Sequence, residues 1–345
     1  MMIRVMIEPS YGANLWAQAY LTGIHEEARK KGYALQMLTD EDIASDNHPV
    51  LLVGSTVDWL KTHQTRLAAQ SVPCVIAGIP PQSIRCGFAA PDYDEAIADF
   101  AFRTSGNRAL FAVHPSSASD EEKKRAFQFY CPEGKIYENQ GNLIDAAERL
   151  VQNANQFQAV LCANDVAAMM LRRLLHDSAS PWLFAFGEQA LPSEEKISLF
   201  RMDLFTCGTQ ALHLCRKLEK EPYVRHCVWV PCHLDAVDAG NALKVSTSEP
   251  STENHSDFYL DPHVEEVFRF KALLTEMDEL DLDILRELLR GARYFDMAES
   301  LHTTENTIKY RLKRMNTVMG LHDRAELLEL AHSYLIQDKL SKKQP

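Results

Sequence analysis

The chain has 345 residues, of which 46% are hydrophobic and 24% are charged, and its formal net charge is -12. This composition supports buried cores and excludes a disordered chain, and the length predicts two or three domains. The acidic balance excludes a protein that coats nucleic acid with its whole surface. It does not exclude one DNA-binding module with a basic face, because the electrostatic attraction to nucleic acid depends on local phosphate contacts.

The N-terminus leads directly into an apolar, strand-like segment without the features of a signal peptide, so we expect a cytoplasmic protein. No apolar run is long enough to predict a membrane span. The eight cysteines are scattered, and most lie in apolar runs, as expected for reduced, buried thiols. The segment HCVWVPCH, residues 226–233, carries zinc-type ligands, but its Cys-x4-Cys spacing is not a common one for structural zinc. We expect no metal and no cofactor.

Short apolar runs alternate with amphipathic helical stretches from residue 3 to about 235. Strands are predicted at IRVMIE, ALQML, PVLLVG, PCVIAG, RALFAV, FQAVLCA, WLFAFG and CVWVP. Helices are predicted over residues 14–33, 55–70, 92–105, 142–153, 164–177 and 203–219. Unbroken apolar strands that alternate with helices indicate βαβ units and parallel sheets. Because these units exceed one ordinary doubly wound sheet, we expect an α/β fold of two similar lobes, with a cleft at the carboxyl ends of the strands.

The pattern changes at residue 238. Residues 238–262 are rich in Ser, Thr, Asn, Asp and Pro and lack periodicity, which indicates a linker. The remaining residues, 263–345, have no strand signal and are predicted to be all-helical. The expected organisation is therefore a two-lobed ligand-sensing domain at 1–237, a linker at 238–262 and an all-α domain at 263–345. An apolar stripe near the start of the last part (Val264, Val267, Phe268 and Leu274) offers a surface for contact with the lobes or with a second copy.

Four short helices are predicted in the C-terminal part, at residues 281–291, 294–301, 305–320 and 323–336. The second and third are joined by about three residues, which is the helix-turn-helix plan. In the third helix Ile308, Leu312 and Met315 form one apolar face, and basic residues cover the rest. The apolar face is expected to pack on the other helices, and the basic face could enter the major groove of DNA, which is wide enough for a helix.

The segment ENTIKYRLKRMNTVMGLHDRAELLELA, residues 305–331, resembles the recognition helix and fourth helix of LuxR-type DNA-binding domains. Thr307, Ile308, Lys309, Gly320 and the run 324–327 match that pattern, and NTIKYRLKR is also similar to purine-catabolism-type regulators. Arg311 stands where the LuxR-type family often has His, and Val318 where it often has Lys. The resemblance implies a helix-turn-helix module. The expected DNA-binding residues are Thr304, Asn306, Thr307, Lys309, Tyr310, Arg311, Lys313 and Arg314.

Residues 3–235 resemble the periplasmic-binding-protein-like sensor domain of lactose-repressor-family regulators. The opening helix ends in Glu26, Glu27, Ala28, Gly32 and Tyr33, and QAVLCANDVAAMMLRRLL resembles the second-lobe hallmark of that family. The resemblance implies a cleft that binds a small molecule such as a sugar. The matching cleft residues are Tyr11, Asn14, Trp16, Asp92, Tyr93, Asn164, Asp165 and Glu188, with Lys123 and Arg125 where that family has an arginine. FGEQ departs from the usual Gly-Phe-x-Asp loop.

The residues favour a transcription regulator over three other classes. An enzyme is not expected because no Gly-rich phosphate loop or Gly-x-Ser-x-Gly motif is present. A receiver domain would need an acidic pair after the first strand and an Asp at the end of the third, where this chain has Glu8-Pro9 and Gly54. An exported solute-binding protein would need a signal peptide. The expected protein is a homodimer that binds DNA and a small effector. The alternative is a regulator whose α/β part is a ligand-free dimerisation or partner-binding module.

Overall fold

The computed structural model describes residues 2–12, 14–39, 48–79, 86–175, 181–188, 197–221, 224, 226–234, 266–267, 269–270, 273 and 277–335. The predicted linker at 238–262 lies outside these residues, as do Val264, Phe268 and Leu274 of the predicted apolar stripe. Val267 of that stripe is described and is fully buried. Within this part of the chain, no helix is both long enough and apolar enough to cross a membrane.

The first lobe is built on a six-stranded parallel sheet with the order β11-β5-β4-β3-β1-β2. Its strands are β1 (Met2–Ile7), β2 (Ala34–Leu38), β3 (Val50–Val53), β4 (Cys74–Ala77), β5 (Cys86–Asp92) and β11 (Cys227–Pro231). Its helices are α1 (Pro9–Gly12), α2 (Leu15–Lys31), α3 (Val57–Ala69) and α8 (Leu204–Lys220). Every residue of β3 and β4 is buried, which explains their unbroken apolar sequences.

The second lobe repeats this plan with the order β12-β10-β9-β8-β6-β7, in which only β12 is antiparallel to its neighbour. The strands are β6 (Arg108–Val113), β7 (Lys135–Glu138), β8 (Ala159–Cys162), β9 (Trp182–Gly187), β10 (Ile197–Arg201) and β12 (His233–Leu234). The helices are α4 (Tyr93–Arg103), α5 (Ala118–Tyr130), α6 (Leu143–Val151) and α7 (Asp165–Leu174), with a 3-10 turn at Ala154–Gln156. The predicted two-lobed α/β fold is therefore confirmed.

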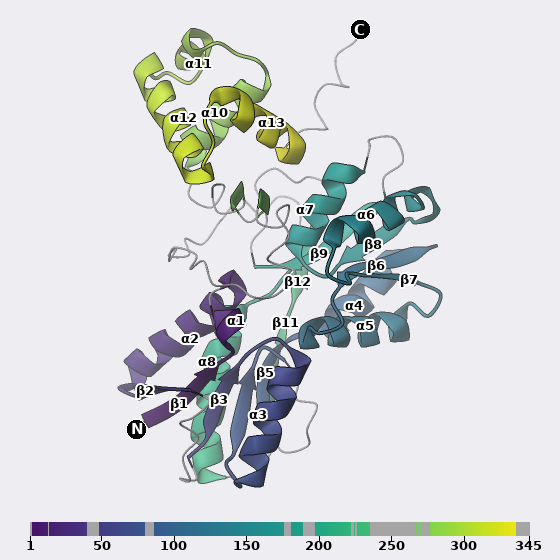
Figure 1. Ribbon diagram of the computed structural model, residues 1–345, viewed down its shortest axis with the longest axis vertical. Coiled ribbons are helices and arrows are strands. Elements are labelled where there is room, and N and C mark those ends of the chain that lie inside the picture. Colours follow the sequence, from purple (N-terminus) through teal and green to yellow (C-terminus); the bar gives the residue numbers. More distant parts are fainter. Residues whose placement is uncertain are drawn as a thin grey trace.

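Helices follow at the four places predicted after the linker: α10 (Glu279–Leu289), α11 (Tyr294–Ser300), α12 (Glu305–Met319) and α13 (Arg324–Leu335). Figure 1 shows these helices grouped at one end of the molecule, with α13 beside α7 of the second lobe. Buried side chains of α7, of α10–α13 and of Val267, Phe270 and Leu273 belong to one hydrophobic cluster. The C-terminal helices thus share a core with the second lobe.

Candidate functional site

A cavity of about 280 Å³ lies between the two lobes. Residues that follow the carboxyl ends of strands line it from both sides, as expected for open α/β sheets. The first lobe contributes Tyr11, Trp16, Tyr20, Gly54, Ser55, Thr56, Gly78 and Ile79. The second lobe and the crossings between lobes contribute Tyr93, Ala112, His114, Ser116, Ser117, Ser119, Asp120, Lys123, Ala163, Asn164, Met202 and Leu204.

Aromatic rings form a large part of the cavity wall. Burial raises the pKa of the Tyr11, Tyr20 and Tyr93 hydroxyls, and the nearby Glu188 carboxylate adds to the effect at Tyr11. The three phenols therefore stay neutral and can donate hydrogen bonds at physiological pH. With Trp16 they offer apolar faces edged by hydroxyl groups.

One charged pair lies in the cavity wall, and it is neutralised within the protein. Lys123 is 4% exposed, and its ammonium donates to the Asp120 carboxylate (2.9 Å) and to the Ala163 carbonyl (2.8 Å). The same ammonium lies 4.9 Å from the centre of the Tyr93 ring. Asp120 also accepts from the His114 main-chain N–H (3.1 Å). The two charges compensate each other, so the pair adds no net charge to the cavity wall.

The cavity is also lined by a polar segment, residues 114–119, which runs from the end of β6 into the first turn of α5 and is called the polar loop below. The Ser116 main-chain N–H donates to His114 Nδ1 (3.2 Å), and the Ser116 hydroxyl lies 2.7 Å from the same nitrogen. Because Nδ1 accepts from the main chain, the proton of the neutral ring is on Nε2, which makes that atom a donor.

The backbone is strained beside this loop. Ala112 has φ 67, at the point where the pairing of β6 with β7 shifts register. A residue other than glycine in the left-handed region costs energy, and such strain often accompanies functional sites.

The structure divides the predicted ligand-binding residues into two groups. Tyr11, Trp16, Tyr93, Lys123 and Asn164 line the cavity. The other five do not line it: Asn14, Asp92, Arg125, Asp165 and Glu188. The polar loop at 114–119 was absent from the prediction. Its three serines come shortly after the RALFAV strand, so they lie beyond the carboxyl end of a strand, which is the position that selected Asn164.

The second group has mainly structural contacts. Asn14 caps α2 by accepting from the Ala17 N–H (2.8 Å), and Asp92 caps α4 by accepting from the Glu95 N–H (3.0 Å). Arg125 pairs with Glu122 on the surface (2.7 Å). Asp165 is buried against Gly187, and Glu188 is half-buried after β9.

A second candidate site is the surface of α12. Its inner face is the buried row Ile308, Leu312, Met315 and Met319, and Thr304 caps its start by accepting from the Thr307 N–H (3.2 Å). Gly320 ends the helix in the left-handed conformation, with φ 66. The side chains that point away from the buried row are exposed: Asn306, Lys309, Tyr310 and Lys313.

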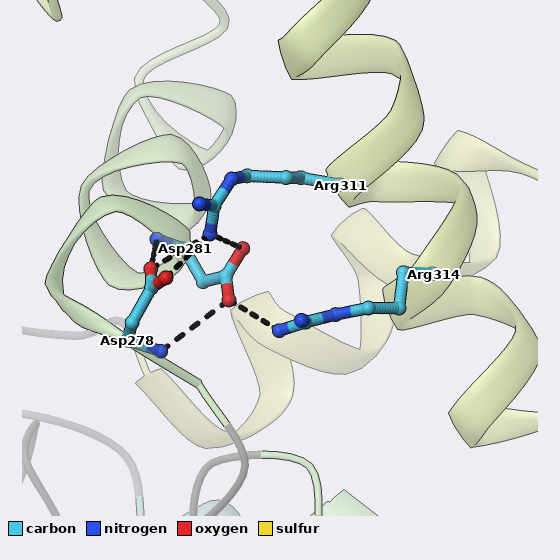
Figure 2. Close-up of polar contacts among 4 residues, drawn as sticks. All are labelled: Asp278, Asp281, Arg311 and Arg314. Carbon is cyan, nitrogen blue, oxygen red and sulfur yellow. Dashed lines mark hydrogen bonds and ion pairs between the residues drawn. The ribbon is translucent and has the colours of Figure 1, made fainter.

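The two arginines of α12 contact α10 and do not lie on this outer face. Arg311 Nη1 is 2.7 Å from Asp278 Oδ2 and 2.9 Å from Asp281 Oδ1, and Arg314 Nη2 is 2.5 Å from Asp281 Oδ2 (Figure 2). The Asp281 side chain is 0% exposed. The hydrogen bond from Arg311 lowers the pKa of the Asp278 carboxyl. We call these four residues the α10–α12 ion-pair cluster; it fixes α12 against α10.

The two lysines differ from the arginines. Lys309 is exposed and pairs with Glu305 one turn earlier (3.1 Å), and its ammonium lies 5.5 Å from the centre of the Tyr294 ring. Exposed pairs of this kind contribute little and exchange readily for another anion. Lys313 is also exposed. The sequence run of four cations is therefore split, with two cations bound to α10 and two directed outward.

Comparisons with known proteins extend the structural result. No protein-family model matches the chain, and no curated protein matches it. Among solved structures, the transcriptional regulator CelR in complex with cellobiose has a TM-score of 0.56 at 13% identity, covering 68% of this chain and 83% of that one. The probable maltose operon transcriptional repressor MalR from Staphylococcus aureus has a TM-score of 0.55 at 14% identity, covering 69% and 98%. A sugar transporter from Clostridium phytofermentans has a TM-score of 0.55 at 13% identity, covering 68% and 99%. At these identities the likeness establishes the fold alone, and that fold is the two-lobed, periplasmic-binding-protein-like one.

Proposed function

We propose that the chain is a cytoplasmic, ligand-responsive transcription regulator that acts as a homodimer. A small, uncharged polar metabolite, such as a sugar, binds between the lobes, and α11 and α12 form a LuxR-type helix-turn-helix that binds DNA. The observation that carries the proposal is the outer face of α12, where Asn306, Lys309, Tyr310 and Lys313 are exposed opposite a fully buried row. An exposed helix face with cations and an amide has the chemistry of a major-groove reader.

The surroundings of α12 support this assignment. Only residues 301–304 separate α11 from α12, and His302 turns the chain there with φ 50. After α12, Asp323 accepts from the Ala325 and Glu326 N–H groups, and Glu326 accepts from the His322 N–H (2.7 Å). Arg324 donates to the Ala292 carbonyl (2.8 Å). The Arg-Ala-Glu-Leu run therefore caps α13 and ties it to the main chain at Ala292, while the outer face of α12 stays exposed.

The cavity supports the ligand part of the proposal. Hydroxyl groups on both lobes can donate to and accept from a polyhydroxylated ligand, and aromatic rings can cover its apolar faces. Because Asp120 and Lys123 neutralise each other, the pair gives the cavity wall no net charge that would attract an ionic ligand. CelR, one of the solved structures with a similar fold, is a complex with cellobiose, which accords with a ligand of this class.

Helix α7 offers a route from the cavity to the C-terminal helices. Asn164, which caps its first turn, lines the cavity. Arg173, in its last turn, pairs with Glu266 (3.1 Å), and α13 packs against the helix. A ligand whose contact with Asn164 differs between two positions of α7 could thus bias the position of α12, which is the condition for allosteric coupling.

The DNA part is tested by selecting duplexes from a random library with the full-length chain and measuring their affinity. Lys309→Ala and Lys313→Ala should each weaken binding by about 1–3 kcal/mol for a lost base contact. Lys61→Ala, an exposed lysine on α3, is the matched control and should bind as wild type does. If the two α12 variants also bind as wild type does, α12 is not the reading helix.

The ligand part is tested by thermal shift with a panel of neutral sugars and polyols. A true ligand stabilises the folded protein by about 2.7 kcal/mol at a hundredfold excess over Kd. Asn164→Ala should reduce that stabilisation, whereas Arg125→Ala, on the surface of α5, should keep it. A ligand that stabilises the Asn164 variant fully must bind elsewhere. A chain that no member of the panel stabilises would favour a ligand-free dimerisation or partner-binding role for the lobes.

A further inference from the structure

Two segments from opposite lobes are joined main chain to main chain at the edge of the cavity. Residues 55–57 follow β3 of the first lobe, and residues 116–118 lead into α5 of the second. The Val57 N–H donates to the Ser116 carbonyl (2.9 Å), and the Ala118 N–H donates to the Ser55 carbonyl (2.8 Å). These two bonds make an isolated antiparallel bridge between Thr56 and Ser117.

Apolar packing accompanies the bridge. Ala118 is 4% exposed and belongs to a hydrophobic cluster whose other members, such as Met6, Leu60 and Ile76, all belong to the first lobe. The first residue of α5 therefore inserts its methyl group into the core of the opposite lobe.

Each segment is also held rigidly within its own lobe. Glu8, which is 3% exposed, accepts from the Ser55 N–H (2.7 Å), the Thr56 N–H (3.1 Å) and the Thr56 hydroxyl (2.5 Å). On the other side the Ser117 N–H donates to the His114 carbonyl (3.0 Å). Both halves of the contact are thus preorganised, which reduces the entropy lost when they meet.

The two N–H donors of the bridge lie at the starts of helices. Val57 and Ala118 are the first residues of α3 and α5, and N–H groups in the first turn have no acceptor within their own helix. Here each one finds its acceptor in the opposite lobe.

We propose that residues 55–57 and 116–118 form an interlobe clasp that holds the lobes closed with or without a bound ligand. All donors and acceptors of the clasp belong to the protein, so closure does not require a ligand to bridge the lobes. Four clasp residues (Ser55, Thr56, Ser116 and Ser117) also line the cavity, so the clasp sets the width of the cavity as well. The inference concerns the arrangement of the lobes and holds whatever the protein binds.

Proline substitution can remove the clasp without disrupting the helices. Proline is favoured at the first position of a helix, and the preceding residue must then be extended. Thr56 (φ -84, ψ 138) and Ser117 (φ -86, ψ 118) satisfy this condition. The variant carrying Val57→Pro and Ala118→Pro therefore loses both interlobe N–H donors and keeps helix-compatible backbones.

The test measures the radius of gyration of the full-length, extensively dialysed protein by small-angle X-ray scattering. The double-proline variant should be larger than wild type. Val57→Ala, which keeps the N–H, and Glu279→Pro, at the first position of α10, should match wild type. Circular dichroism establishes that each variant is folded. A folded double-proline variant with the wild-type radius of gyration overturns the proposal.

A measurement on the wild-type chain needs no variant. Hydrogen exchange at the Val57 and Ala118 amides should be at least about fivefold slower than the intrinsic rate, the factor that one net hydrogen bond supplies. Exchange of both amides at the unprotected rate would mean that the clasp is open in solution, and the proposal would be wrong.

Discussion

Replacing Asp281 by alanine should loosen α12 while leaving the two lobes intact. The Asp281 carboxylate is wholly buried, accepts from Arg311 and Arg314, and also accepts from the Asp278 main-chain N–H (3.3 Å). Its removal leaves two guanidinium groups without their shared anion and opens the capping box at the start of α10. We expect the effect to be confined to the C-terminal helices because all four residues of the α10–α12 ion-pair cluster lie there.

The magnitude follows from the burial of the partners. Breaking a fully buried ion pair costs about 3–5 kcal/mol, because it leaves an unpaired charge away from water. The side chains of Arg311 and Arg314 are 22% and 44% exposed, so water can solvate them once the carboxylate is gone. We therefore expect a loss in the upper part of the range of about 1.5–3 kcal/mol for hydrogen bonds to charged groups, that is, about 2–3 kcal/mol.

Hydrogen exchange at the Ile308 and Leu312 amides is the appropriate assay, because it reports local opening of α12. Exchange should accelerate by about 30- to 150-fold, which corresponds to 2–3 kcal/mol at about 1.4 kcal/mol per factor of ten. The four tryptophans, at positions 16, 59, 182 and 229, all lie in the lobes, so their fluorescence should show an unchanged unfolding transition.

The matched control is Asp283→Ala on the same helix. Asp283 is 45% exposed and pairs only one turn away with Arg286 (2.7 Å), and such surface pairs contribute about 0.2–1 kcal/mol. If Asp281→Ala and Asp283→Ala accelerate exchange equally, the buried carboxylate does not hold α12 in place.

Three further predictions concern charges at the two candidate sites. Replacing both Lys309 and Lys313 by alanine should reduce the salt dependence of DNA binding: the slope of log binding constant against log salt concentration should fall in magnitude by up to about 2 if both lysines contact phosphates. An unchanged slope would exclude those contacts. The pKa of Asp278 is lowered in the folded protein, so its contribution to stability is complete above its unfolded pKa of about 3.9 and is lost as the pH falls below that value. The acid-induced acceleration of α12 exchange should therefore be weaker in Asp278→Asn; equal pH profiles would contradict this. Lys123→Met leaves the Asp120 carboxylate buried without its partner and should destabilise the second lobe by about 3–5 kcal/mol. Urea unfolding followed by tryptophan fluorescence measures this loss, and adding Asp120→Asn should restore part of it. No restoration would mean that the pair is not the source of the effect.

The two lobes could be predicted from the sequence because a strand buried on both faces needs an unbroken apolar run. PVLLVG, PCVIAG and FQAVLCA fall on β3, β4 and β8, all of whose residues are buried. The edge strand β7 was not predicted, because none of its residues is fully buried and its sequence, KIYE, has no apolar run. Helix ends were also predictable from local chemistry, since the left-handed Gly32 and Gly320 and the cap at Thr304 act within one turn.

The roles of individual polar side chains depended on tertiary contacts. Helical periodicity separated the buried row of α12 from its charged residues, but Arg311 and Arg314 point toward Asp278 and Asp281, which lie about 30 residues earlier in the chain. In the cavity, the same rule that selected Asn164 applied to the serines after β6, and only the folded chain brings them to face Tyr11 and Trp16 from the other lobe. Sequence patterns thus determined the elements, because strand burial and helix capping are local. Which charges pair and which polar groups share a cavity was decided by the packing of distant segments, because an ion pair or a cavity requires partners whose separation in space the sequence does not specify.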